Sequence, residues 1–229
     1  MLVQLLIKTA IRITIFAIIT TLFFTNPTAL DYLNTRNPIP WLFWAVLATD
    51  MLFRLIPNRK IPIGARKHFA SSFAPAVNPC RRYKSPHRGA FLCALTWVAI
   101  TGGTIAAMRF AGILSPAALI VFAALYAVVD MLFILVFCPF RAFFTRARCC
   151  ATCRIHAWDY PMIIMPLIIY PGVVSISLFV MAALVVARWE IALMRHPERF
   201  SDEFNINLRC SNCIGKICKL RIKPQIRHK

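Results

Sequence analysis

Four apolar runs, each close to the length needed to cross a lipid bilayer, constrain the fold of this chain most strongly. They cover residues 2–25, 39–56, 90–113 and 116–137. A helix needs about 20 apolar residues to cross a hydrocarbon core of about 30 Å. Because a chain in hydrocarbon must satisfy its own backbone hydrogen bonds, each run is expected to be a helix. The sequence therefore predicts an all-α, polytopic integral membrane helix bundle with four spans.

The composition supports the same class. Hydrophobic residues make up 59% of the 229 residues and charged residues only 15%, whereas soluble domains hold about 45–50% and about 25%. A soluble fold of this length could not bury so much apolar surface. A soluble protein is therefore excluded.

A fifth apolar region, residues 161–187, is expected to enter the membrane and return. Arg and Lys residues flank it on both sides, and as a helix residues 162–170 would rise only about 14 Å, half of the hydrocarbon core. The dipeptide Pro171-Gly172 is typical of a turn. We therefore predict a broken re-entrant hairpin with a returning helix over 173–195. The alternative is one long tilted helix, which would place the basic C-terminal segment outside, against the charge rule.

A short internal repeat suggests how the chain is organised. Asp50-Met-Leu-Phe-Arg-Leu at 50–55 matches Asp130-Met-Leu-Phe-Ile-Leu at 130–135, and each copy ends an apolar run before a proline and a basic segment. Two parallel helix-hairpin repeats, related by an axis along the membrane normal, would give this pattern. The expected units are 1–80 and 81–160 for the two hairpins, 161–195 for the broken hairpin, and 196–229 for a Cys-rich basic tail.

The positions of the basic residues predict the orientation. Of the 27 Lys and Arg, eight lie in 57–89, four in 141–160 and ten in 188–229, while 26–38 holds only Arg36. Basic loops stay in the cytoplasm, so we expect a multi-pass protein of the cell inner membrane with both termini cytoplasmic. The first run lacks a clear small-x-small cleavage site, so a retained helix is favoured over a signal peptide.

The net charge of +19 indicates a partner of opposite charge. Because the charges flank apolar runs, anionic lipid head groups of the bilayer are the expected partner. Nucleic-acid binding is not expected, since the basic segments follow the topology of the membrane rather than one soluble face.

Two groups of cysteines form the main chemical feature. The first is Cys149-Cys150-Ala-Thr-Cys153, and the second is Cys210-Ser-Asn-Cys213-Ile-Gly-Lys-Ile-Cys218. A Cys-x-x-Cys turn places two thiolates on one side of a backbone bend, as zinc and iron–sulfur sites require. The returning hairpin would bring both groups to the same membrane face. The predicted metal ligands are Cys150, Cys153, Cys210 and Cys213, with Cys149, Cys218, Cys138 and His156 as further candidates.

The spacing of the cysteines does not decide which metal they would bind. Three alternatives remain open: an iron–sulfur cluster, a structural zinc site, and no metal. Thiolates are suitable ligands for either metal centre. The cytoplasmic face keeps thiols reduced, which disfavours structural disulfides. Without metal, the thiols of 149–153 would form a redox couple, with Arg148 and Arg154 favouring the thiolate.

The segment Val136-Phe137-Cys138-Pro139-Phe140 resembles the Cys-Pro-Phe element of membrane-bound polyferredoxin-type quinol dehydrogenases. In that family such cysteines ligate four-iron clusters beneath a small helical bundle. The resemblance covers a few residues, and the repeated cysteine runs of ferredoxins are absent from this sequence. It implies a redox role with a quinone as partner.

Two acidic residues, Asp50 and Asp130, fall within apolar runs at matching places of the repeat. An ionisable residue inside a span is costly and suggests a functional site, here a proton or ion path. The alternative is structural pairing. Asp50 is four residues before Arg54, a helical ion-pair spacing, and Asp130 could reach Arg109 across helices. The small residues Gly102 and Gly103 are expected to support helix packing rather than a substrate site.

Together these features predict an iron–sulfur-type metal-binding membrane protein for electron transfer or redox chemistry at the cytoplasmic face, with a quinone or a redox protein as partner. The alternatives are a non-enzymatic membrane protein whose zinc knuckle binds a partner, and a soft-metal or ion transporter that uses Asp50 and Asp130. No hydrolase, kinase or ATPase motif is present. The sequence leaves open whether the protein is an enzyme.

Overall fold

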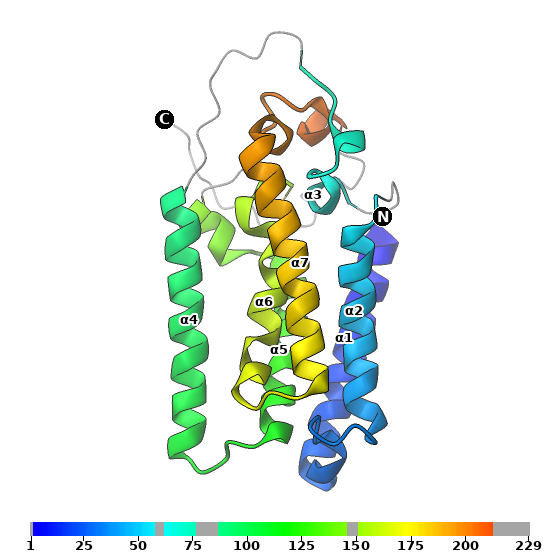
Figure 1. The fold of residues 1–229 in the computed structure, drawn as a ribbon, viewed down its shortest axis with the longest axis vertical. Helices are drawn as coiled ribbons and strands as arrows, with labels where there is room; N and C mark the ends of the chain where they lie inside the picture. The colour runs from blue at the N-terminus through cyan, green and yellow to red at the C-terminus, as the bar shows by residue number, and fades with distance from the viewer. Residues whose placement is uncertain (1, 58–61, 77–86, 146–150, 213–229) are drawn as a thin grey trace.

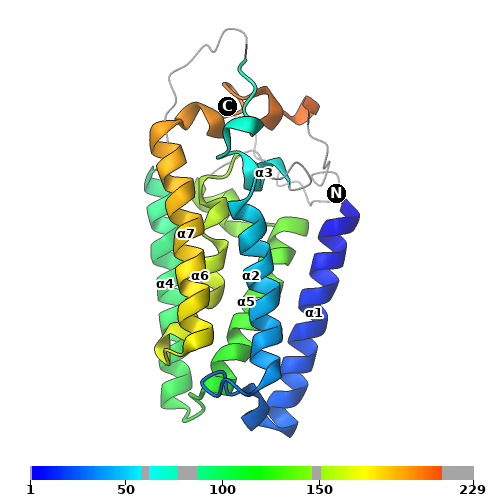
Figure 2. The same cartoon turned by 45° about the vertical axis from the view of Figure 1, so that its right-hand side comes forward.

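The computed structural model describes residues 2–57, 62–76, 87–145 and 151–212. Four helices in this part of the chain are long and apolar enough to cross a membrane. They are α1 (Leu2–Thr25), α4 (His87–Phe110), α5 (Pro116–Leu135) and α7 (Val173–Arg195). A further helix, α2 (Pro38–Leu55), has 18 residues and runs beside them (Figure 2). The prediction of an all-α membrane helix bundle is confirmed.

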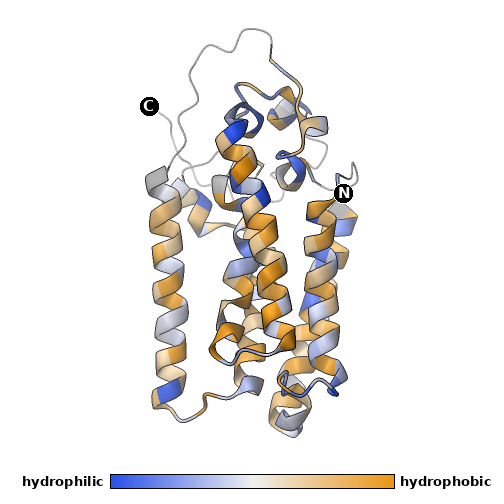
Figure 3. Ribbon diagram, viewed as in Figure 1, coloured by the Kyte–Doolittle hydropathy of each residue, from blue (hydrophilic) through white to orange (hydrophobic). Residues whose placement is uncertain are grey.

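The helices pack in pairs around a central α5. The main partner of α1 is α5, and the main partner of α2 is α7. The core residues between them, such as Leu47, Met51 and Leu119, are fully buried. Hydrophobic residues also cover the outer faces of the helices along their lengths (Figure 3), as a surface in contact with lipid requires.

The predicted broken hairpin is present. A short limb consists of α6 (Asp159–Ile164) and the 3-10 helix η5 (Met165–Ile169), after which the chain turns at 170–172 and returns as α7. The two limbs lie side by side, and the turn stops short of the far ends of α1 and α4 (Figure 1). The alternative of one long tilted helix is therefore wrong.

Proline explains why this limb breaks, and two side chains repair the break. In a continuous helix the carbonyl of Met162 would accept from residue 166 and that of Leu167 from residue 171, but both are prolines without an N–H. Instead, Trp97 Nε1 donates to the Met162 carbonyl at 3.1 Å, and the Tyr32 hydroxyl donates to the Leu167 carbonyl at 3.1 Å. The broken backbone is thus satisfied by protein groups, as hydrocarbon demands.

Most of the polar structure gathers at one end of the bundle, which we call the basic end. It holds the beginnings of α1 and α4, the ends of α2, α5 and α7, and the loop with the short helix α3 (Ile63–Arg66) (Figures 1 and 2). The opposite end holds 26–37, 111–115 and the turn at 170–172. The described parts of the basic segments 57–89, 141–160 and 188–229 therefore meet at the basic end, as the charge pattern predicts.

The attachment of α4 differs from that of the other long helices. It contacts the π-helical segment η3 (Phe140–Thr145) and η5. A Cβ atom on Gly89 would lie 2.2 Å from the carbonyl oxygen of Phe144, so only glycine allows this close approach of α4 to η3. A Cβ atom added to Gly102 or Gly103 would meet no neighbouring atom within 4 Å, so these two glycines do not support helix packing among the described residues.

Candidate functional site

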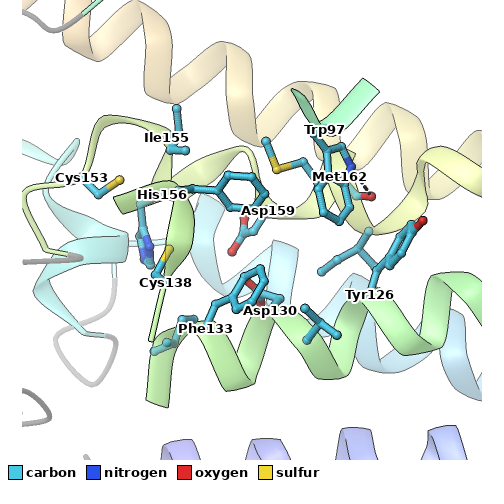
Figure 4. Close-up of a pocket in the computed structure, with 14 residues that line it drawn as sticks. Trp97, Tyr126, Asp130, Phe133, Cys138, Cys153, Ile155, His156, Asp159 and Met162 are labelled. Atoms are coloured by element: carbon cyan, nitrogen blue, oxygen red, sulfur yellow. Dashed lines mark hydrogen bonds between the residues drawn. The ribbon is translucent and has the colours of Figure 1, made fainter. Parts of the chain in front are cut away.

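A cavity opens at the basic end between α4, α5, η3 and the segment that leads into α6 (Figure 4). We call it the thiol cavity. The space open to the centres of water molecules is about 80 Å³, which is enough for several waters or one small ring, since one water needs roughly 10–15 Å³ by that measure. Its walls are mainly apolar and aromatic, with Trp97, Tyr126, Phe133 and Phe140 among them.

Two thiols and one imidazole line the same cavity. Cys138, Cys153 and His156 gather on one side of it, away from Trp97 and Tyr126 (Figure 4). Cys153 is buried and its Sγ lies 3.6 Å from Thr145 Oγ1, while Cys138 Sγ accepts a hydrogen bond from the Arg141 backbone N–H at 3.4 Å. Three of the eight candidate ligands thus face the cavity or border it.

A third thiol, that of Cys93 in α4, lies near these two, although it does not line the cavity. Its side chain is fully buried. Cys138 and Cys153 lie near enough to Cys93 to interact electrostatically with its thiol. The fold therefore brings together three thiols that are far apart in the sequence.

The remaining predicted ligands lie mostly outside the described residues. Cys149, Cys150, Cys213 and Cys218 belong to that set, and for Cys210 the backbone is placed but the side chain is not. Among the described side chains, no three His, Cys, Asp or Glu residues are close enough to hold a metal ion. The shared site of Cys150, Cys153, Cys210 and Cys213 stays a prediction.

The tail that carries Cys210 returns to the basic end. The Asn205 side chain is fully buried; its Oδ1 accepts from the Ala74 N–H, and its Nδ2 donates to the Ser72 and Arg199 carbonyls. An antiparallel bridge joins Pro75 and Asn205. The segment before the second Cys-x-x-Cys group is thus fixed to the loop at 62–76.

The same loop also holds the second part of the first Cys-x-x-Cys group, residues 151–153. Lys67 is fully buried, and its ammonium donates to the carbonyls of Ala151 at 2.7 Å and Cys153 at 3.0 Å. It also lies 4.9 Å from the ring centre of Trp189. One loop therefore contacts both cysteine-bearing segments, although the sequence indicated only a basic loop there.

His68, next to Lys67, is a buried imidazole against the rings of Phe69 and Trp189. Burial, and then the charge of Arg188, lower the pKa of His68 to about 4. The neutral form is therefore the native one, whereas the unfolded chain takes up a proton near pH 6.5.

We expect this histidine to make stability fall at acidic pH. Because its folded pKa is depressed, the unfolded state binds the extra proton first. The free energy of unfolding should thus decline as the pH falls from about 6.5 to about 4, by up to about 3 kcal/mol. Unfolding in detergent, followed by tryptophan fluorescence across this range, measures the decline. His68→Phe should flatten the curve; an unchanged slope in this variant would contradict the assignment.

Charged residues inside the bundle form a second feature, which we call the ion-pair network. Arg12 of α1, 4% exposed, donates from Nη1 to Asp130 Oδ2 and from Nη2 to Asp50 Oδ2, both at 3.1 Å. Nη1 also donates to the Ala127 carbonyl at 3.0 Å, and Lys8 binds the other oxygen of Asp50. Two cations and two carboxylates thus balance in charge, with Arg12 at the centre.

A second buried pair lies beside the thiol cavity. Arg54 of α2 donates to both carboxylate oxygens of Asp159, at 2.9 and 2.6 Å, and also to the His156 carbonyl at 3.1 Å. Its guanidinium lies 4.4 Å from the ring centre of Tyr160. Asp50 therefore pairs with α1 rather than with Arg54, contrary to the expected helical pair.

The two membrane acids lie at similar depth, as the repeat implies, because one guanidinium contacts both. The repeat itself stays a prediction. The sequence suggested Arg54 and Arg109 as partners of these acids, whereas the structure pairs the acids with Lys8 and Arg12. A signal for these partners was present in the sequence. Lys8 and Arg12 interrupt an apolar run, and buried charges of opposite sign in different runs require one another.

Comparisons with models of protein families, with characterised proteins and with solved structures found no match to this chain. The fold defines an integral membrane protein of the helix-bundle class. Its distinctive features are the thiol cavity and the charge-balanced network beside it.

Proposed function

We propose that the protein is an integral membrane redox protein with an iron–sulfur-type centre, ligated by thiolates, at the basic end. The observation that carries the proposal is the position of Cys138, Cys153 and His156 around one cavity whose other walls are mainly apolar and aromatic. Thiolates select iron–sulfur clusters and zinc over harder metals. Contacts from one loop to both cysteine-bearing segments support a shared centre of Cys150, Cys153, Cys210 and Cys213.

The ion-pair network favours this function over transport. A transported ion needs a carboxylate that can release its partner, whereas Asp50 and Asp130 are both held by the buried Arg12. Buried charges that are paired in this way are the ordinary structural solution within a membrane. We therefore assign these acids to the stability of the bundle and place the chemistry at the thiols.

Substitution of single cysteines tests the shared centre. Each of four single substitutions should lower the iron content of anaerobically purified protein: Cys150→Ser, Cys153→Ser, Cys210→Ser and Cys213→Ser. A site with four ligands loses affinity for its metal when any one of the ligands is removed. Cys80→Ser is the matched control and should retain iron. Retention of iron in all four variants would refute the ligand set. Stoichiometric zinc in place of iron would support the structural zinc knuckle instead.

We further infer that the basic end faces the cytoplasm of a cell inner membrane. The clustering of Lys and Arg at that end supports this orientation, and anionic lipids would bind there. In an otherwise cysteine-free variant, a single cysteine in place of Ser71, which is exposed at the basic end, should be labelled by an impermeant thiol reagent only after lysis. One in place of Asn34, exposed at the opposite end, should be labelled in intact cells. The reverse pattern would invert the topology.

A further inference from the structure

The thiol cavity combines groups that suit a particular kind of small molecule. Its apolar wall is a series of aromatic rings packed edge to face: Trp97 on Tyr126, Trp97 on Phe140, and Phe133 on Phe140, with centroids 4.9–5.8 Å apart. Rings arranged in this way are fixed in place and favour a flat aromatic guest. A guest of one six-membered ring matches the open volume of about 80 Å³.

The polar part of the lining favours hydrogen-bond donors on that guest. Asp130 and Asp159 both border the cavity and approach each other there (Figure 4). Arg12 and Arg54 balance the charges of the two carboxylates. The cavity is therefore suited to a neutral guest. A carboxylate accepts several hydrogen bonds at once, and a hydroxyl group on the ring can donate to it. Both oxygens of Asp159 and one oxygen of Asp130 already accept from the two arginines, and a hydroxyl group can use the acceptor capacity that remains, whereas a plain hydrocarbon such as a lipid tail cannot.

We propose that the thiol cavity binds the ring of a lipid-soluble quinol. The ring would lie among Trp97, Tyr126 and Phe133, with hydroxyl groups toward Asp130 and Asp159 and with Cys138 and Cys153 beside it. The role of this site rests on the proposed redox function, because the quinol would exchange electrons with the thiolate-bound centre. Binding itself depends only on the cavity.

Calorimetric titration of the purified full chain under anaerobic conditions tests the proposal. The probe is toluquinol, a single-ring quinol, and the reference is pseudocumene, in which methyl groups replace the two hydroxyls at almost the same shape. Toluquinol should bind about ten-fold more tightly than pseudocumene, because only the quinol donates to the buried carboxylates. Equal binding of the two would show a merely apolar cavity and overturn the proposal.

A matched pair of variants locates the site. Val129 of α5 lines the cavity, whereas Val121, two turns earlier on the same helix, does not. Both valines are partly buried, so a phenylalanine at either position adds the same bulk. Val129→Phe should weaken toluquinol binding about ten-fold or more by filling the cavity, and Val121→Phe should leave it unchanged. Equal effects of the two variants would place the quinol elsewhere and overturn the proposal.

Iron content, measured on the same samples, separates this inference from the proposed function. Protein that holds iron but does not bind toluquinol would overturn the quinol site and leave the redox centre standing. Protein that binds toluquinol through the cavity but holds no iron would support the quinol site and count against the iron–sulfur centre.

Discussion

Replacement of Arg12 by leucine is expected to lower the free energy of unfolding by about 3–5 kcal/mol, the range seen when one partner of a buried ion pair is removed. Arg12 is the only described partner of Asp130 and one of two partners of Asp50. Without the guanidinium, Asp130 would lose its ion-pair partner in a largely buried position. Reversible unfolding in mixed detergent micelles measures the loss.

Two companion variants separate the charge effect from lost packing. Lys8→Leu in the same helix removes a cation that is 48% exposed, so its effect should stay within about 1 kcal/mol. The double variant Arg12→Leu, Asp130→Leu removes the orphaned carboxylate as well and should recover roughly half of the loss, through coupling of the two sites. A double variant as unstable as the sum of the two singles would contradict the pairing.

Replacement of Arg54 by leucine should have an effect of similar size, about 3–5 kcal/mol. This side chain forms a bidentate ion pair with Asp159, the first residue of α6, and so joins α2 to α6. It also donates to the His156 carbonyl, just before α6. Such fork geometry is the strongest form of a charge-assisted hydrogen bond. Without Arg54, the wall of the thiol cavity that Asp159 and His156 form would also lose its contacts with α2.

A double-mutant cycle of Arg54→Leu and Asp159→Leu measures the coupling directly, with an expected interaction of about 2–3 kcal/mol. The control is Arg188→Leu on α7. Arg188 is exposed and donates to the Leu55 carbonyl, so its removal should cost less than about 1 kcal/mol. A coupling near zero would show that the Arg54–Asp159 pair does not stabilise the fold.

The helices and the hairpin could be predicted because local sequence determines them. Apolar runs of membrane length specify helices in hydrocarbon, and a proline without an N–H specifies where a helix must break. The groups that repair the break, Trp97 and Tyr32, could not be predicted, since they come from distant segments. Their position depends on how the helices pack.

The residues of the candidate site could likewise be predicted only in part. Cys153, Cys138 and His156 could be identified as candidates from residue type and spacing. The partners of Asp50 could not, because the choice between Arg54 in its own helix and Arg12 in another depends on tertiary packing. Lys67 illustrates the point most clearly: the sequence shows one of many basic residues in a loop, whereas the fold buries this ammonium against two backbone carbonyls.

Metal and sulfide analysis of the anaerobically purified wild-type protein, together with its visible absorption spectrum, tests the central claim most directly. The proposed function predicts iron and acid-labile sulfide in equal amounts, with a visible absorption band that bleaches on reduction, as expected for a thiolate-bound cluster. A colourless protein without iron or sulfide, in which the cysteines are intact and reduced, would contradict the claim.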